Sequence, residues 1–543
     1  MMHVNLVNLF DQTISEVQMS VADGLIKTIE IIGAENTLLP YTLPGFVDAH
    51  VHIESSMLTP SQFARLAVVH GTVATVSDPH EIANVMGYEG VEYMIADGKR
   101  LPFKFCFGAP SCVPATTFET AGAILDPEDM KRLLSKPEIG YLAEVMNFPG
   151  VLHDEPDMVA KIDWAKHFNK PIDGHAPGLR GSAAKKYVAA GITTDHECFT
   201  YDEALEKIGY GMKILIREGS AARNFDALIP LLAEYPAQIM FCSDDKHPDN
   251  LVEGHINMLV KRALKLDHSL WNVLQAACLN PVMHYRLPVG LLRQDDPADF
   301  ILVDNLTDFN VLETWLDGEV VAKNLVSCLP DLRSNHINRF DCETKKPENF
   351  QCKHNLSSSQ IRVIEALEGQ LITNALLEPA LLKNGLIVSD PKHDILKITV
   401  VNRYQNSVPA IAFIKNFGLK AGAIASSVAH DSHNIIAVGV DDEMICEAVN
   451  LIIQAKGGVA AVGLGEKHLL ELPIAGLMTD KNGYDVAESY TKMDHFVKTK
   501  LKSTLKSPYM TLSFMALLVI PSIKLSDKGL FDGDNFQFVP LST

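Results

Sequence analysis

The sequence is short of basic residues, of aromatic residues and of paired cysteines. Its 47 Lys and Arg are outnumbered by 67 Asp and Glu, which gives a formal charge of -20, and only 7% of its 543 residues are aromatic. Because nucleic-acid binding needs clustered Lys and Arg, an acidic chain without such clusters disfavours that class of partner. We therefore expect no nucleic acid, and a neutral or cationic small molecule as the partner.

The chain also lacks a cysteine framework and a long hydrophobic run. Its nine cysteines are odd in number and include no Cys-x-x-Cys pair, which predicts reduced, partly buried thiols in a cytoplasmic protein. The N-terminus has no basic region followed by an apolar stretch, so we expect no secretory signal. Met510 to Ile523, the most apolar late stretch, is shorter than the roughly 20 residues that span a bilayer. We expect a buried strand or helix there, and no membrane partner.

What the sequence does contain is a repeating unit. Between Leu43 and His255 an apolar β-rich run, a polar or glycine-containing turn and a segment with helical periodicity follow one another. The apolar runs are Leu43–His52, Thr72–Asp78, Phe103–Ser111, Ile139–Met146, Pro171–His175, Ile192–His196, Lys213–Arg217 and Gln238–Asp244. Segments between them, such as Phe225–Tyr235 and Asn250–Leu264, have the length and apolar spacing of helices outside a parallel sheet. The pattern predicts a (β/α)₈ TIM-like barrel over residues 43–295.

Short alternating segments lie on both sides of this predicted barrel. They are Val4–Leu9 and Val17–Ile32 before it, and Ala298–Val303 and Val311–Val321 after it. The last of these contains a hairpin-like Asp317-Gly318 turn. We expect the two flanks, residues 1–42 and 296–335, to form one small β-sandwich domain.

The remainder of the chain begins with a polar stretch. Arg333 to Asn355 is rich in Asn, Lys, Glu and Pro, which predicts a connector. Residues 356–543 are then expected to form an additional C-terminal α+β domain. Its predicted strands are Ile398–Val401, Ala410–Lys415, Ala421–Ser427 and Ile435–Val440, followed by an amphipathic helix over Asp442–Ala455. The predicted fold class is therefore α/β, with the barrel as the central domain.

Six potential metal ligands stand at the ends of the predicted barrel strands. They are His50, His52, Glu144, His175, His196 and Asp244. Because the C-terminal ends of barrel strands share one face, these side chains should meet in space. Imidazoles and carboxylates in this number suit two divalent cations facing one substrate, which indicates a hydrolytic metalloenzyme. For each residue alone, a packed histidine or a solvated strand-end acid is the alternative.

Two of these carboxylates are candidates for catalysis. Glu144 could bridge two cations through its two oxygens. Asp244 could bind one metal and take a proton from a hydroxide that the cations activate, which makes it the candidate general base. Asp245 is its rival, because the sequence does not say which carboxylate of the pair points inward.

Two further strand-end clusters could hold a substrate. Ser77-Asp-Pro-His-Glu provides His80 and Glu81, and Ile216-Arg-Glu-Gly-Ser provides Arg217, Glu218 and Ser220. Together they offer the donors and acceptors that a purine edge would need, with salt bridges between loops as the alternative. A later polar run, Ala429-His-Asp-Ser-His-Asn, could reach over the barrel mouth, bind something of its own, or form a hydrogen-bonded turn between two strands.

The ordered ligand series on a predicted barrel with a split β domain resembles the amidohydrolase superfamily. Within it, longer stretches resemble the bacterial adenine deaminase family. They include Pro44-Gly-Phe-Val-Asp-Ala-His-Val-His-Ile-Glu-Ser-Ser, Ser77-Asp-Pro-His-Glu-Ile-Ala-Asn-Val, Met146-Asn-Phe-Pro-Gly-Val, Asp173-Gly-His-Ala-Pro-Gly-Leu, Asp195-His-Glu-Cys, Asp244-Asp-Lys-His-Pro-Asp and Ala425-Ser-Ser-Val-Ala-His-Asp-Ser-His-Asn-Ile. These stretches are specific, and because they extend into the C-terminal domain, the resemblance covers most of the chain.

The resemblance implies hydrolysis of adenine to hypoxanthine and ammonia in purine salvage. In the implied mechanism a metal-bound hydroxide adds to C6 and Asp244 relays the proton. The resemblance also implies a homo-oligomer, at least a dimer, and about two divalent metals per chain. Mn²⁺ is the expected metal, and His and carboxylate ligands without thiolate permit Fe²⁺ or Zn²⁺ as well. The zinc deaminases of the cytidine type need Pro-Cys-x-x-Cys, which this chain lacks.

Two other classes of function stay open. One is a different amidohydrolase reaction, such as deamination of adenosine or another aminopurine, or hydrolysis of a cyclic amide or an N-acyl amino acid. Product analysis separates these reactions from adenine deamination. The other is a non-catalytic binding protein on a retained barrel, which predicts the loss of at least one ligand. The sequence disfavours this second class, because all six ligand positions are filled.

Overall fold

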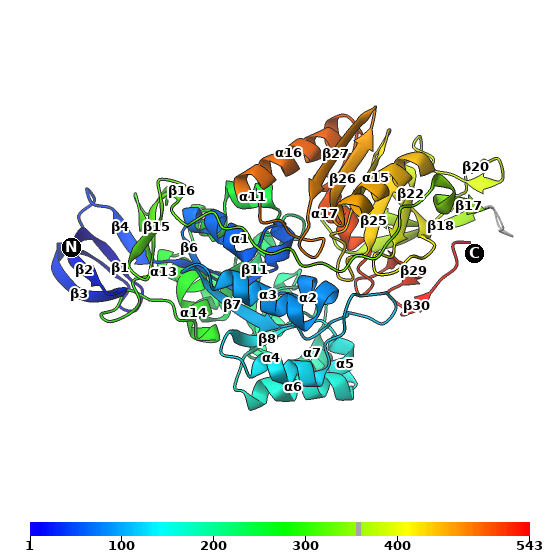
Figure 1. Ribbon diagram of the computed structural model, residues 1–543. Helices are drawn as coiled ribbons and strands as arrows, with labels where there is room; N and C mark the ends of the chain where they lie inside the picture. Colours follow the sequence, from blue (N-terminus) through cyan, green and yellow to red (C-terminus); the bar gives the residue numbers. More distant parts are fainter. Residues whose placement is uncertain (354–359, 543) are drawn as a thin grey trace.

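The computed structural model describes residues 1–353 and 360–542, and parallel strands lie at its centre (Figure 1). These strands are β5 (Phe46–Val51), β6 (Thr72–Ser77), β7 (Lys104–Ala109), β8 (Ile139–Val145), β9 (Ile172–Gly174), β10 (Thr194–Asp195), β11 (Lys213–Arg217) and β12 (Ile239–Cys242). Hydrogen bonds order them as β5-β6-β7-β8-β9 in one sheet and β10-β11-β12 in another. Every residue of β5 and β6 is buried, as expected for parallel strands covered on both faces.

Backbone hydrogen bonds join these two sheets at both of their edges. Between β9 and β10, the Thr193 N–H donates to the Ile172 carbonyl at 2.9 Å. A Cβ on Gly174 would lie 2.4 Å from the Thr194 carbonyl oxygen, so this close approach requires glycine. Beyond β12, the Asp244 N–H donates to the His50 carbonyl at 2.9 Å. The strands therefore curl into the TIM-like α/β arrangement that the repeating unit predicts.

Helices follow most of these strands and pack outside them (Figure 1). They are α1 (Pro60–Ala67), α2 (His80–Met86), α3 (Tyr88–Gly98), α4 (Pro127–Leu134), α5 (Phe148–Leu152), α6 (Pro156–His167), α7 (Gly181–Ala189), α8 (Tyr201–Gly209), α9 (Phe225–Leu228), α10 (Leu231–Glu234), α11 (Pro248–Glu253), α12 (Ile256–Lys265), α13 (Leu270–Leu274) and α14 (Asn280–Tyr285). Side-chain caps fix some of their starts. Asp126 forms a capping box with Asp129 at α4, and the Thr200 hydroxyl accepts from the Glu203 N–H at α8.

Two helices that the sequence predicts as continuous are broken. Phe225–Tyr235 divides into α9 and α10, and Pro230, which has no N–H to donate, lies at the break. Asn250–Leu264 divides into α11 and α12 around His255. The His255 ring is drawn inward, because its Nε2 lies 2.7 Å from the Asp48 carboxylate and its Nδ1 2.7 Å from the Thr72 hydroxyl. These buried polar contacts outweigh the helical periodicity of the segment.

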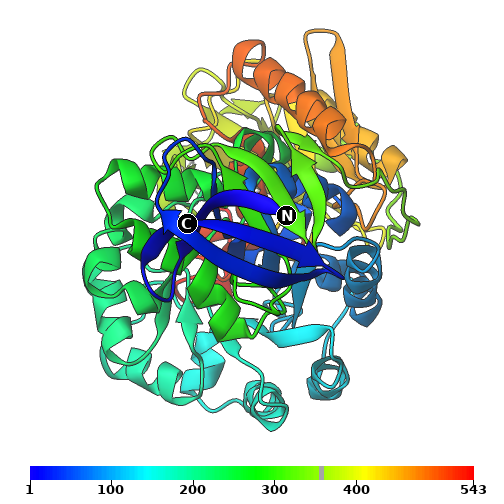
Figure 2. The ribbon, with the colours of Figure 1, turned by 90° about the vertical axis from the view of Figure 1, so that its left-hand side faces the viewer.

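The two flanks of the barrel pair in a single sheet. Its strands are β1 (Met2–Asn8), β2 (Thr13–Ala22), β3 (Leu25–Ala34), β4 (Tyr41–Pro44), β13 (Phe300–Val303), β14 (Val311–Leu316), β15 (Glu319–Lys323) and β16 (Val326–Ser327), in the order β16-β15-β14-β13-β4-β1-β2-β3. Figure 2 shows the first strands crossing one end of the molecule. Because β4 pairs with both β1 and β13, the strands form one continuous sheet and not the two sheets of the expected sandwich. The predicted Asp317-Gly318 hairpin lies between β14 and β15, which pair antiparallel.

A second mixed sheet forms the core of the C-terminal part (Figure 1). Its strands are β18 (Gln360–Ala366), β19 (Thr373–Pro379), β22 (Ile395–Val401), β23 (Ala410–Lys415), β24 (Ala423–Ser426), β25 (Ile435–Gly439), β26 (Gly458–Gly463) and β27 (Glu466–Glu471), in the order β19-β18-β23-β22-β25-β24-β26-β27. The helices are α15 (Asp442–Ala455), which has the predicted bounds, α16 (Gly483–Thr499) and α17 (Pro508–Phe514). The expected end of the connector at Asn355 and start of this part at Leu356 lie outside the described residues.

Apolar packing joins the C-terminal part to the barrel. Val47 and Val76 of the barrel belong to the same buried hydrophobic cluster as Met510 and Phe514 of α17. All of α17 is buried, in agreement with the expectation for the stretch from Met510. Among the described residues, no helix combines the length and the apolar character needed to cross a bilayer.

Candidate metal-binding site

The structure brings all six predicted metal ligands together at the C-terminal end of the barrel strands. His50 lies in β5 and Glu144 in β8, while His52, His175, His196 and Asp244 follow β5, β9, β10 and β12. Each of them is at least nine-tenths buried. Segments spread along almost 200 residues therefore meet because every strand ends at the same face of the barrel.

Glu144 occupies the middle of this cluster. Its Oε1 lies 3.3 Å from His52 Nε2 and 3.4 Å from His80 Nδ1. Its Oε2 lies 2.7 Å from His175 Nδ1 and 3.3 Å from His196 Nε2. The two oxygens thus face two different sets of imidazoles, which is the arrangement expected of a carboxylate between two cations.

Asp244 faces the histidine pair of β5. Its Oδ1 lies 3.6 Å from His50 Nε2 and 3.4 Å from His52 Nε2, and these two nitrogens are 3.2 Å apart. Asp244 adopts a left-handed φ of 54°, which is uncommon for a residue other than glycine. Asp245 also lines this cavity, and a carboxylate oxygen of Asp245 lies within 4.8 Å of ligand atoms of His52 and Asp244. Its Oδ1 differs from that of Asp244 in accepting a hydrogen bond from the Ser55 hydroxyl and in lying 4.0 Å from His430 Nε2.

Arg217 holds the other oxygen of Asp244. Its Nη1 lies 2.5 Å from Asp244 Oδ2, and its Nη2 donates to Glu197 Oε2 at 2.8 Å. Arg217 and Glu197 are both buried, so this ion pair is screened little by solvent. One oxygen of Asp244 is therefore fixed by a cation of the chain while the other faces His50 and His52.

Burial and charge set the protonation of the cluster. Burial alone would raise the pKa of Asp244, but Arg217, His52 and His196 together outweigh it and hold that pKa well below its usual range. For Glu144, burial is outweighed by His175, His196 and His52 together, and the pKa lies well below its usual range. Burial lowers the pKa of His50 well below its usual value. Ionised carboxylates and a neutral imidazole are the forms that bind a divalent cation.

The donor set fits divalent cations. Ligand atoms of His50, His196 and Asp244 lie within 4.8 Å of one another, as do those of Glu144, His175 and His196. The buried Nδ1 of His50 has no hydrogen-bond partner among the described residues. Imidazoles and carboxylates without thiolate are ligands that Mn²⁺, Fe²⁺ and Zn²⁺ accept.

The predicted substrate residues divide into two groups. His80, Glu81 and Arg217 line the cavity that contains the ligand cluster. Glu218 does not line it, because its carboxylate pairs with Arg262 at 3.2 Å. Ser220 does not line it either, since its hydroxyl donates to Asn250 Oδ1 at 2.7 Å.

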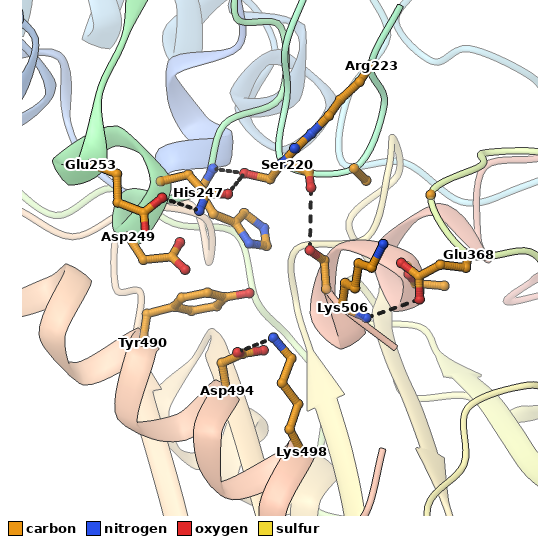
Figure 3. Close-up of a pocket in the computed structure, with 15 residues that line it drawn as sticks. Ser220, Arg223, His247, Asp249, Glu253, Glu368, Tyr490, Asp494, Lys498 and Lys506 are labelled. Carbon is orange, nitrogen blue, oxygen red and sulfur yellow. Dashed lines mark hydrogen bonds and ion pairs between the residues drawn. The ribbon is translucent and has the colours of Figure 1, made fainter. Parts of the chain in front are cut away.

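Ser220 belongs instead to a separate neighbouring cavity of about 430 Å³ (Figure 3). His247, beyond β12, and Tyr490 of α16 line it, and their rings pack edge to face with centroids 4.8 Å apart. None of the six predicted metal ligands lines this cavity. The cavity that contains Ser220 is therefore separate from the cavity that contains the ligand cluster.

Other residues of the ligand cavity were not predicted from the sequence. Glu197 directly follows His196 in Asp195-His-Glu, so its position next to a candidate ligand was an available signal. His430 and Asp431 come from the polar run between β24 and β25, for which a position over the barrel mouth was one of the alternatives left open by the sequence. Apolar side chains of the C-terminal part, which we call the roof, cover the cavity, and these are Leu371, Phe514, Leu517 and Ile520. No local pattern connects the roof to the barrel.

Comparison with known proteins shows the family. Residues 41–321 match the amidohydrolase family, and residues 370–537 match the adenine deaminase C-terminal domain. An adenine deaminase of Sulfurovum sp. (strain NBC37-1) is 55% identical, over 99% of this chain and 99% of its own. The chain belongs to the adenine deaminase family. Adenine deaminases of Salinibacter ruber and Borreliella burgdorferi are 53% and 48% identical, each over 98% of this chain and 97% and 98% of their own.

The two matched regions divide the cavity between them. All six predicted ligands lie in the amidohydrolase region, whereas the roof and His430 lie in the adenine deaminase C-terminal domain. The region that matches the adenine deaminase C-terminal domain therefore forms part of the wall of the site.

Proposed function

We propose that this protein hydrolyses adenine, with water, to hypoxanthine and ammonia. The observation that carries the proposal is a buried cluster of six ligands, centred on Glu144, in a chain of the adenine deaminase family. The acidic chain suits a small uncharged base better than a phosphate-bearing substrate.

The cluster would hold two divalent cations, and Mn²⁺ is the metal we expect. His50, His52 and Asp244 would hold one cation and His175 and His196 the other, with Glu144 between them. When bound, the cations supply Lewis acidity that lowers the pKa of a water molecule towards neutrality. The remaining chemistry belongs to side chains of the chain itself.

Asp244 is the proposed general base. Arg217 occupies its Oδ2 at 2.5 Å, so Oδ1 is the oxygen that takes a proton from the attacking water. That proton then passes to a ring nitrogen or to the leaving amino group, and C6 loses ammonia. Burial of the site excludes bulk water, which strengthens the electrostatic contribution of Arg217.

His80 and Glu81 are the proposed contacts for the base. His80 lies between the ligand cluster and Glu81, with its Nδ1 3.4 Å from Glu144 Oε1 and its Nε2 3.4 Å from Glu81 Oε1. A flat ring that reacts next to Glu144 would therefore present its far edge to Glu81. Glu218 and Ser220 are left out, because their side chains are engaged outside the cavity.

The proposal extends to the organisation of the chain. We propose a discontinuous small β domain of residues 1–42 and 296–335, a barrel of residues 43–295 and a C-terminal domain over residues 356–543. The single sheet formed by both flanks and the match over residues 370–537 support these bounds. A homo-oligomer, at least a dimer, is expected of the assembly.

Isotope labelling in a single turnover tests this function. Mn²⁺-reconstituted protein is mixed with a substoichiometric amount of adenine in ¹⁸O-labelled water, and products are analysed by mass. The proposal expects hypoxanthine with one label at the C6 oxygen, and one ammonia for each base consumed. A ring-opened product, or turnover of cyclic amides without turnover of adenine, would assign the same cluster to another amidohydrolase reaction.

A further inference from the structure

The polar run Ala429–Asn434 reaches from the C-terminal sheet into the barrel. It connects β24 to β25, and both of its histidines contact Glu81, which is about 350 residues away in the chain. His430 Nδ1 bonds to Glu81 Oε1, and His433 Nε2 bonds to Glu81 Oε2. All three residues are at least 98% buried. Each oxygen of one carboxylate is thus held by its own imidazole.

The position of His433 is fixed from behind. Its Nδ1 accepts a hydrogen bond from the Ala429 N–H at 3.2 Å, so the proton of the neutral ring lies on Nε2 and is donated to Glu81. Its backbone carbonyl accepts from Nη1 of Arg403 at 3.3 Å. Arg403 is fully buried, and it also donates through its backbone N–H to Asn434 Oδ1 at 3.1 Å.

The roof fixes the other histidine. The His430 ring stacks on Phe514, with ring centroids 4.5 Å apart and an angle of 12° between the planes. Phe514 itself lines the ligand cavity. Contacts within the C-terminal part, none of which involves Glu81, therefore fix the positions of both imidazoles.

We propose that His430 and His433 are positioning residues that aim the Glu81 carboxylate at a ring N–H of the purine base. This inference rests on the proposed function and adds to it a source of specificity. A free carboxylate can rotate about its last bond, whereas two donors held by another part of the chain fix its plane. The remaining lone pairs of Glu81 then point in one direction, where an N–H of the base can donate. Recognition of the base is in this way shared between the barrel and the C-terminal domain.

Paired substitutions test the inference. Gln can reproduce the Nε2–H donor of His433, and Asn can reproduce the Nδ1–H donor of His430, whereas Leu reproduces neither. We expect His433→Leu and His430→Leu to raise the KM for adenine and to weaken inhibition by hypoxanthine, each by about tenfold or more. We expect His433→Gln and His430→Asn to recover most of that loss. Ser432→Ala, in the same run but without contact to Glu81, is the matched control and should behave as the parent.

A double-mutant cycle separates positioning from a merely structural role. If His433 acts through Glu81, then adding His433→Leu to Glu81→Ala should change kcat/KM by less than about twofold. Additive losses in the cycle, or equal losses in the Leu and Gln variants, would overturn the inference. Bound metal is measured in every variant and should remain at the parental level.

Failure of the inference and failure of the function give different results. A parent that hydrolyses adenine, with Leu variants that retain its KM, would overturn only the role of the histidines. A metal-loaded parent that does not hydrolyse adenine would contradict the proposed function, and the inference with it.

Discussion

The two oxygens of Glu144 have different neighbours, and this asymmetry decides what its substitution should do. Glu144→Gln replaces one oxygen by an amide nitrogen, which cannot face a cation. We expect metal affinity and turnover to fall by more than the roughly 10–100-fold typical of residues outside the coordination sphere. Metal analysis and ammonia release on the same samples measure both effects.

Glu138→Gln is the control for that substitution. Glu138 directly precedes β8, at the opposite end of the strand from Glu144, and pairs with Lys99 in a partly exposed contact. The Glu138→Gln variant should bind metal and hydrolyse adenine as the parent does. Full metal content and turnover in Glu144→Gln would refute the bridging role.

A buried lysine supports one wall of the site. Lys207 is 1% exposed and donates to Asp195 Oδ2, Glu203 Oε1 and the Ala176 carbonyl, each at 2.7 Å. Lys207→Met would leave two buried carboxylates without their cation, so we expect a loss of about 3–5 kcal/mol in the free energy of unfolding. Chemical denaturation of metal-free protein measures it.

Lys186→Met is the comparison for Lys207→Met. Lys186 pairs with Asp154 at the same distance of 2.7 Å, but both side chains are largely exposed. Its removal should cost only about 0–1 kcal/mol. Equal losses in the two variants would show that burial does not decide the strength of these pairs.

His70 makes the free energy of unfolding depend on pH. It is 6% exposed, and burial lowers its pKa to about 4. An unfolded histidine takes up a proton near pH 6.5, so stability from His70 is fully present above that pH and is lost as the pH falls towards 4. The shift corresponds to about 3 kcal/mol.

His70→Gln tests this dependence. His70 Nε2 donates to the Leu251 carbonyl at 2.9 Å, and Gln can keep that bond without titrating. The free energy of unfolding of the variant should fall less than that of the parent between pH 7 and pH 4.5, when both are measured without metal. Parallel pH profiles for the two proteins would contradict the assignment.

At the scale of elements, the strands of the barrel could be predicted because each carries a buried apolar run that ends in a polar turn. Lys213–Arg217 was predicted with the bounds that β11 has. The helices were less predictable where a single residue has a partner far away in the chain. His255 interrupts the predicted Asn250–Leu264 helix because Asp48 and Thr72 bind its ring, and neither contact leaves a local signal.

The roof is the element that we expect to move. The ligand cavity beneath it has a volume of about 30 Å³, room for about two water molecules. The segment 508–520 carries Phe514, Leu517 and Ile520, so we expect it to open and close around the substrate.

Hydrogen exchange measures this motion. Amides of residues 508–520 should exchange faster in the free protein than with saturating hypoxanthine, while amides of β22 serve as a reference that does not change. Exchange of residues 508–520 that is unaffected by hypoxanthine would contradict a moving roof.

At the scale of the whole molecule, the sequence could predict the cluster of metal ligands better than the contact between the C-terminal part and the barrel site. The six ligands follow from a repeat, because each stands at the end of a strand and all strand ends meet at one face. The polar run around His430 was visible in the sequence, but its contact with Glu81 was not. That contact depends on how the C-terminal sheet packs on the barrel, and Phe514 and Arg403 fix it through contacts distant in sequence.

The most direct test of the account is ammonia release from adenine by Mn²⁺-reconstituted parent, Asp244→Asn and Asp245→Asn, with bound metal determined in the same samples. We predict turnover in the parent, a loss of at least about 1,000-fold in Asp244→Asn, and a smaller loss in Asp245→Asn, whose carboxylate bonds to Ser55. Metal-loaded parent without turnover of adenine, or an Asp244→Asn variant as active as the parent, would contradict it.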